Sequence, residues 1–139
     1  MAEDQDPKVL EFRMQRLRKA PRNWTYWIAG FTAANGIFLA IQHDITIIAG
    51  LALPFAISGP APHLIAGAIL AVIAYTSSKL PELLFIPLVT YIIDTCFAAY
   101  AQLWSGVFMH LVVLAFVGFS FVGIRALQTA QAKQNEVSV

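Results

Sequence analysis

The sequence is poor in charged residues and contains a single cysteine. Of its 139 residues, 12% are charged and 58% are hydrophobic, whereas a soluble domain carries roughly 25% charged residues. Between residues 24 and 124 only four charged residues occur: Asp44, Lys79, Glu82 and Asp94. Such a long, weakly charged stretch is typical of a chain embedded in a bilayer. This composition excludes a nucleic-acid-binding domain and a large soluble enzyme domain.

The sequence also lacks the motifs of common active sites. One cysteine, Cys96, cannot form an internal disulfide or a CxxC site for a metal or redox reaction. No HExxH metalloprotease motif, no P-loop and no GxSxG nucleophile motif is present. We therefore expect a protein that is not an enzyme and that binds no cofactor.

Apolar runs follow one another after a polar N-terminus. They cover residues 24–42, 45–58, 64–76, 83–101 and 107–124. The second run is short for a slab of about 30 Å and contains Pro54, which suits a re-entrant or half-helix segment. We expect an all-α membrane protein with four transmembrane helices and one re-entrant segment, with five spans as the alternative. The predicted regions are a polar N-terminus (1–22), a helical bundle (23–126) and a polar tail (127–139).

The N-terminal region is basic and amphipathic. Apolar residues at helical spacing predict a helix over residues 7–20, which Pro21 should end. One interpretation is a helix packed on its own protein; the favoured one is an interfacial helix on membrane lipids or a partner. The expected contacts are Arg13, Arg16, Arg18, Lys19 and Arg22. By the positive-inside rule, this concentration of basic residues predicts a cytoplasmic N-terminus.

Asp94 stands near the middle of the apolar run 83–101, where an acidic group costs about 3 kcal/mol on insertion scales. In an antiparallel pair of helices, His110 would lie within about 3 Å of the same depth, at about 1.5 Å per residue. Asn35 and Tyr91 could join them in one buried polar network. Two roles stay open for these residues: a relay for protons or cations, or hydrogen bonds that hold helices together.

His43, Asp44 and His63 form a weaker candidate, for a metal site. Two histidines and one carboxylate could bind Zn²⁺ or Cu²⁺. Their spacing matches no established metal motif, and histidines are common at membrane interfaces. The sequence therefore favours the absence of a metal site.

The run Tyr26-Trp27-Ile28-Ala29-Gly30, followed by Asn35, resembles the opening of a widespread group of small uncharacterised bacterial membrane proteins with several spans. Further matching positions are Asp94, Met109-His110, Gly123 and Arg125. The chain departs from the group at Met109, where the group has an aromatic residue, and at Leu53-Pro54-Phe55, where it has a polar stretch. The resemblance implies a bacterial inner-membrane protein and no particular activity.

Two functions fit these features. The first is an accessory or structural subunit of a membrane assembly, formed as a homo-oligomer or within a larger complex and in contact with lipids. The second is a small oligomeric channel or transporter, in which Asp94 and His110 relay protons or cations. The small size and the absent motifs favour the first, and no nucleic-acid partner is expected.

Overall fold

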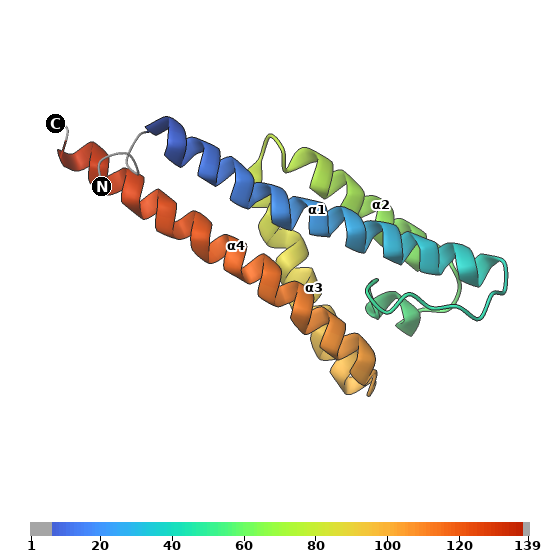
Figure 1. The fold of residues 1–139 in the computed structure, drawn as a ribbon. Helices are drawn as coiled ribbons and strands as arrows, with labels where there is room; N and C mark the ends of the chain where they lie inside the picture. Colours follow the sequence, from blue (N-terminus) through green and yellow to red (C-terminus); the bar gives the residue numbers. More distant parts are fainter. Residues whose placement is uncertain (1–6, 138–139) are drawn as a thin grey trace.

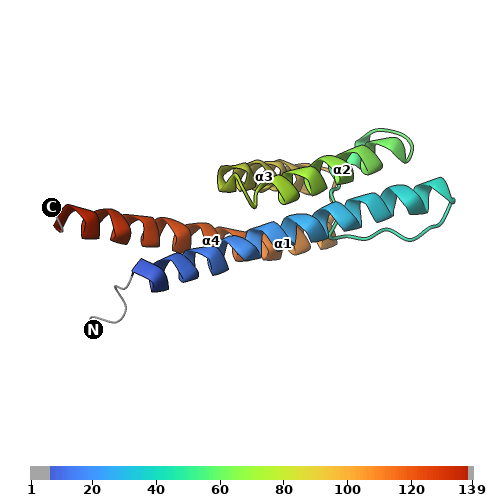
Figure 2. The ribbon, with the colours of Figure 1, turned by 90° about the horizontal axis from the view of Figure 1, so that it is seen from above.

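The computed structural model describes residues 7–137, and most of this part of the chain is helical. Four α-helices and two short 3₁₀-helices follow one another. In order they are α1 (Pro7–Ala40), η2 (Leu53–Ala56), α2 (Ala61–Thr76), η3 (Pro81–Leu84), α3 (Phe85–Tyr100) and α4 (Trp104–Val137). Figure 1 and Figure 2 show α1 beside an antiparallel α2, and α3 beside an antiparallel α4. The two pairs meet along α1 and α4 and diverge in a V.

Two helical stretches are long and apolar enough to cross a membrane: Pro81–Tyr100, which joins η3 to α3, and Trp104–Ala130 of α4. The prediction of four transmembrane helices with a re-entrant segment is therefore wrong, as is the five-span alternative. The 16 residues of α2 extend about 24 Å at about 1.5 Å per residue, too short for a slab of about 30 Å. The apolar half of α1 carries Thr25, Thr32 and Asn35, which lower its mean hydropathy.

The prediction that Pro21 ends the first helix is also wrong, because α1 continues through it. A proline inside a helix removes one backbone hydrogen bond, and here packing outweighs that loss. The Pro21 ring is fully buried and lies near Leu84 and Val117 of the second pair. The carbonyl of Pro21 also accepts a hydrogen bond from the Thr25 hydroxyl, at 2.9 Å. The basic segment is thus the first half of one long helix.

At the other end, α4 continues through residues 127–137, where the sequence predicts a polar tail. The outermost parts of the two predicted polar ends, residues 1–6 and 138–139, lie outside the described residues.

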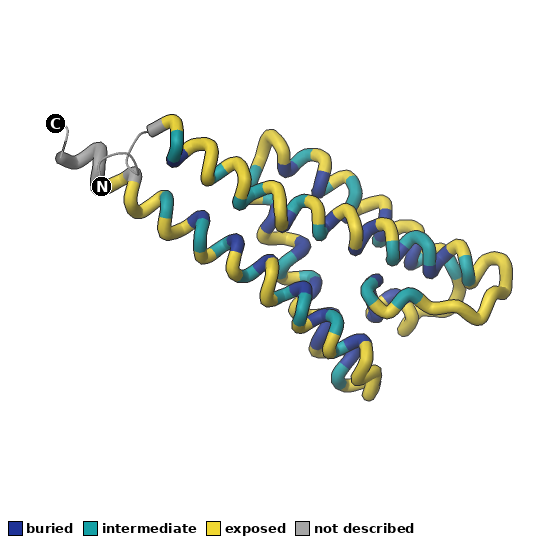
Figure 3. Tube along the Cα trace, viewed as in Figure 1, coloured by how far each residue is buried: buried dark blue, intermediate teal, exposed yellow. Residues whose placement is uncertain are grey.

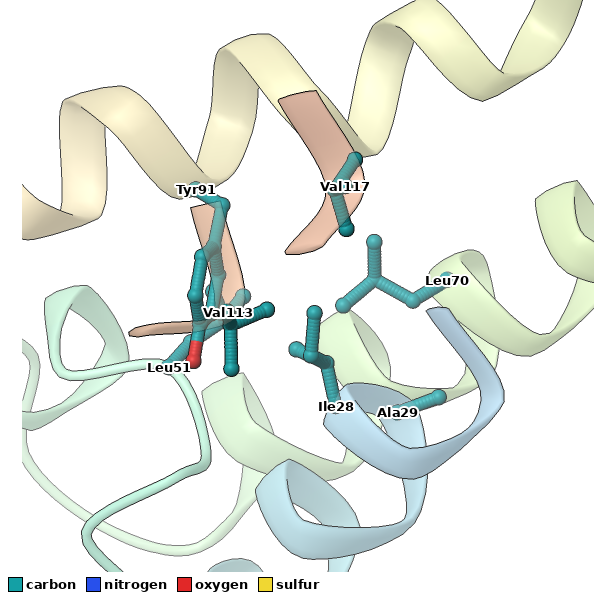
Figure 4. Packing of buried hydrophobic residues seen from close by; sticks show 7 residues of the cluster. All are labelled: Ile28, Ala29, Leu51, Leu70, Tyr91, Val113 and Val117. Carbon is teal, nitrogen blue, oxygen red and sulfur yellow. The ribbon is translucent and has the colours of Figure 1, made fainter. Parts of the chain in front are cut away.

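The hydrophobic core lies where the two helix pairs meet. Its buried side chains come from α1, α2, α3, α4 and the loop after α1 (Figure 4): Ile28, Ala29, Leu51, Leu70, Tyr91, Val113 and Val117. A glycine lets α1 and α2 approach closely, because a Cβ on Gly67 would lie 2.9 Å from the carbonyl oxygen of Ala29. Exposed residues cover the outer faces of the helices (Figure 3).

Candidate functional site

Residues 43–58, called here the inserted segment, leave the end of α1 and fold back toward α3 and α4 (Figure 1). Apart from η2, this segment is irregular, so few of its backbone N–H and C=O groups are paired within a helix. Each such group costs free energy when it is buried without a partner. The polar side chains that the sequence singles out supply these partners.

Asp94 lies on α3 and is fully buried. Its Oδ2 accepts a hydrogen bond from the backbone N–H of Ala52 at 2.8 Å, and its Oδ1 accepts one from Leu53 at 2.6 Å. Both N–H groups stand at the N-terminus of η2, where the first N–H groups have no helical partner. The carboxylate therefore caps η2 from a helix more than 40 residues away in the sequence.

His110 lies on α4 and joins the same carboxylate. Its Nε2 is 2.6 Å from Oδ2 of Asp94, and its Nδ1 is 2.6 Å from the carbonyl oxygen of Gly106. A carbonyl oxygen only accepts, so Nδ1 carries a proton, and the contact between Nε2 and Oδ2 requires one more. Whichever of these two atoms holds the shared proton, the pair has no net charge. Neutrality lowers the cost of burying it.

Tyr91 links this pair to the inserted segment. Its ring stacks on the imidazole of His110, with ring centroids 4.4 Å apart and an angle of 8° between the planes. Its hydroxyl donates to the carbonyl oxygen of Ala49 at 3.1 Å. Tyr91 thus orients His110 and satisfies a backbone acceptor of the inserted segment.

Asn35 binds the same segment from α1. Its Oδ1 accepts a hydrogen bond from the N–H of Ile47 at 2.6 Å, and its Nδ2 donates to the carbonyl oxygen of Ile47 at 3.0 Å. The amide therefore satisfies both backbone groups of one residue. Asn35 joins the network through the inserted segment, whereas Tyr91, Asp94 and His110 are in direct contact.

Sequence reasoning missed Thr32. Its hydroxyl donates to the carbonyl oxygen of Ile28 at 2.7 Å and accepts a hydrogen bond from the N–H of Leu51 at 2.9 Å. The signal was available, because Thr32 precedes Asn35 by three residues and so shares its helix face. Gly50 was missed as well: a Cβ there would lie 2.9 Å from Nδ2 of Asn35.

A small cavity opens beside His110. It has a volume of about 90 Å³ between the inserted segment and the start of α4, and its lining includes Thr46, Phe55 and Ser105. On the side of Tyr91 that faces α1, the cavity lined by Val113 and other apolar side chains measures about 10 Å³, which is about the space of one water. A cavity therefore borders His110 on one side, whereas packing is tight on the other.

The five predicted basic contacts separate into two groups. Arg18, Lys19 and Arg22 line a cavity of about 300 Å³ together with residues of the turn after α2. Arg13 and Arg16 are not part of this lining, and the guanidinium of Arg16 lies over the ring of Phe12, 5.5 Å from its centre.

The candidate metal residues do not form a cluster. His43 and Asp44 are exposed after the end of α1, whereas His63 is buried on α2 with its ring edge-on to Phe55, at 4.3 Å. Within residues 7–137, no three metal-ligating side chains gather. Neither ring nitrogen of His63 has a hydrogen-bond partner among the described residues. Burial lowers the pKa of His63, and the backbone of Gly59 partly offsets this effect.

Comparison with protein-family models, curated proteins and solved structures found no match to this chain. The resemblance to small bacterial membrane proteins therefore stays a prediction.

Proposed function

We propose that this chain is a small integral membrane protein that acts as an accessory or structural subunit of a membrane assembly and is not an enzyme. One observation carries the proposal: the buried polar side chains bind the protein's own backbone. Asn35, Tyr91 and Asp94 each contact the inserted segment, and His110 contacts Asp94. Side chains used in this way hold the fold together and leave little hydrogen-bonding capacity for a substrate.

The outer surface supports a membrane location. Two helical stretches are long and apolar enough to cross a bilayer. On the second, Phe108, Phe119 and Val122 are 67%, 78% and 68% exposed. Large apolar side chains on an outer face are suited to lipid tails or to another membrane helix. Partners consistent with this surface are lipids and either a second copy of the chain or a larger complex.

The distribution of basic residues supports an orientation. Arg18 of α1 and Arg125 of α4 line one cavity at the end of the molecule where α3 begins. Basic residues gather on the cytoplasmic side of membrane proteins. The proposal therefore places this end, with the N-terminus, on the cytoplasmic side of a bacterial inner membrane.

A second function is favoured by a specific contact. Asp94 and His110 are fully buried and in contact at 2.6 Å, and His110 lines the 90 Å³ cavity. This arrangement could accept or release a proton, as a small oligomeric channel or transporter would require. The tight packing on the other side of Tyr91 is the reason that we rank this function second.

The experiment that separates these functions combines size with flux. The protein is extracted from its native membrane in mild detergent, sized, and then reconstituted into liposomes for proton and cation flux. We expect a particle larger than the 15.3 kDa chain in its micelle, and flux equal to that of protein-free liposomes. A monomer without any partner would contradict the accessory role. Flux that is lost in His110→Phe but kept in Asp44→Asn would support the relay instead.

A further inference from the structure

The basic cavity lies at the end of α3 opposite the His110 cavity. From α1 it is lined by Gln15, Arg18, Lys19 and Arg22. Arg18 and Lys19 follow Gln15 by three and four residues and precede Arg22 by four and three, so the four side chains share one helix face. The facing wall is the turn between α2 and α3. The residues of that wall are Ser77, Ser78 and Pro81.

Among the described residues, no acidic side chain lines this cavity. Within residues 7–137, Arg18, Lys19 and Arg22 form no ion pair. The hydroxyls of Ser77 and Ser78 donate to carbonyl oxygens of α2 at 2.7 Å and 2.8 Å. The free donors in the cavity are therefore mainly cationic, and such donors bind anionic oxygens most strongly.

The neighbouring carboxylates of Glu11 and Glu82 do not line the basic cavity. Glu11 accepts a hydrogen bond from Gln15 at 3.5 Å. Glu82 lines the adjacent cavity of about 260 Å³, where Arg18 and Arg125 are also present. In the part of the chain that the structure describes, the three cations of the basic cavity therefore face no carboxylate across it.

The position of the cavity indicates which anion it meets. Pro81 lines the cavity and is the first residue of the candidate span Pro81–Tyr100. The 20 residues of this span extend about 30 Å, the thickness of the apolar slab. Pro81 would then stand at the boundary between lipid tails and headgroups. A volume of about 300 Å³ is within the range of small-molecule sites.

We propose that this cavity binds the phosphate group of an anionic phospholipid. The proposal rests on the membrane location proposed above. Arg18 and Arg22 contact the phosphate oxygens, Lys19 adds a third positive charge, and the lipid tails extend along the exposed apolar faces. An anionic lipid is preferred to a zwitterionic one because no acidic group of the cavity attracts a choline or ethanolamine group.

The test uses the full-length protein in detergent, titrated separately with phosphatidylglycerol, phosphatidylcholine and inorganic phosphate. Bound lipid is counted by native mass spectrometry. Wild type should prefer phosphatidylglycerol. The double variant Arg18→Gln/Arg22→Gln should bind it about 25-fold more weakly, at about fivefold per basic residue removed near the membrane surface.

Arg16→Gln is the matched control, because it removes the same charge from the same helix outside the cavity. Its affinity for phosphatidylglycerol should change by less than about twofold. An equal loss in Arg16→Gln would overturn the proposal in favour of diffuse surface attraction. Equal binding of the two lipids would overturn it too. Inorganic phosphate bound as tightly as phosphatidylglycerol would assign the site to a free phosphate.

Failure of this proposal can be distinguished from failure of the membrane location. A protein released from membranes by alkaline extraction would contradict the membrane location itself. A protein that stays in the membrane after extraction but fails the lipid titration contradicts the lipid site alone.

Discussion

Replacing Asp94 with asparagine is the sharpest test of how the inserted segment is held. The carboxylate accepts hydrogen bonds from the N–H groups of Ala52 and Leu53 and shares a proton with His110. An asparagine has only one acceptor oxygen. If that oxygen keeps the bond from Leu53, the side-chain NH₂ group replaces Oδ2 and faces the N–H of Ala52, donor against donor. The opposite rotamer moves the same conflict to Leu53.

The size of the effect follows from this count. One buried backbone donor loses its partner, which costs about 1–3 kcal/mol. The other N–H group of the segment then donates to a neutral amide oxygen in place of a carboxyl oxygen. Asp94 is fully buried, so bulk water does not reach its side chain. We expect Asp94→Asn to lower the free energy of unfolding by about 3 kcal/mol, roughly a hundredfold in the unfolding equilibrium.

The assay is a denaturant titration of both proteins in the same detergent, with amide hydrogen exchange at Ala52 and Leu53 as a local measurement. Exchange at these two amides should accelerate in the variant. Asp44→Asn makes the same chemical change at an exposed site and should alter stability by less than about 0.5 kcal/mol. The reasoning is refuted if Asp94→Asn is as stable as the wild type, or if both variants lose the same amount.

Three further perturbations test other contacts. Gly67→Ala should destabilise the protein by about 1–3 kcal/mol, because its Cβ would lie 2.9 Å from a backbone oxygen of α1. Gly30→Ala should stabilise the protein by up to about 1 kcal/mol, because its Cβ would have nothing within 4 Å. Denaturant titration of both variants checks these opposite effects. Tyr91→Phe should lower the free energy of unfolding by about 1 kcal/mol in the same titration, because it loses the hydrogen bond to Ala49 and keeps the ring stacked on His110. An unchanged free energy of unfolding would contradict the role of that hydroxyl. The pKa of His63 is lowered in the folded protein, so on acidification His63 is protonated in the unfolded state before it is protonated in the folded state. The contribution of neutral, buried His63 to the free energy of unfolding is therefore complete above about pH 6.5. It decreases as the pH falls below that value. Melting curves recorded above and below this pH should show a loss of stability on acidification in the wild type and a smaller loss in His63→Phe. An equal pH dependence of the two proteins would contradict this role of His63.

The helical character and the position of the buried polar residues could be predicted from the sequence. The apolar run 83–101 matches α3 closely, and 107–124 lies inside α4, because an uninterrupted apolar run has few alternatives to a helix in a bilayer. Counting residues from the turn between them placed Asp94 and His110 at similar depth. The structure brings these two side chains together.

The number of helices long and apolar enough to cross a membrane could not be predicted in the same way. Apolar composition along a run does not distinguish a span from a segment that packs on other helices of the same chain. The buried face of α1 carries Thr32 and Asn35, which bind the inserted segment, and α2 is too short to cross. Pro21 likewise predicts a helix end from the sequence, and only the tertiary structure shows that its ring is buried between helices.

The sequence by itself determined that the chain is helical, that it is apolar enough for a membrane, and that Asp94 and His110 lie at similar depth in neighbouring helices. These properties depend on composition and local spacing. Only the tertiary structure decided what the polar side chains bind. Asp94 accepts hydrogen bonds from the backbone of Ala52 and Leu53, which precede it by 42 and 41 residues. Arg18 faces the turn after α2 across a cavity. Such partners depend on how distant helices cross, and backbone N–H and C=O groups, which every residue type except proline carries in the same form, leave no signature in the sequence.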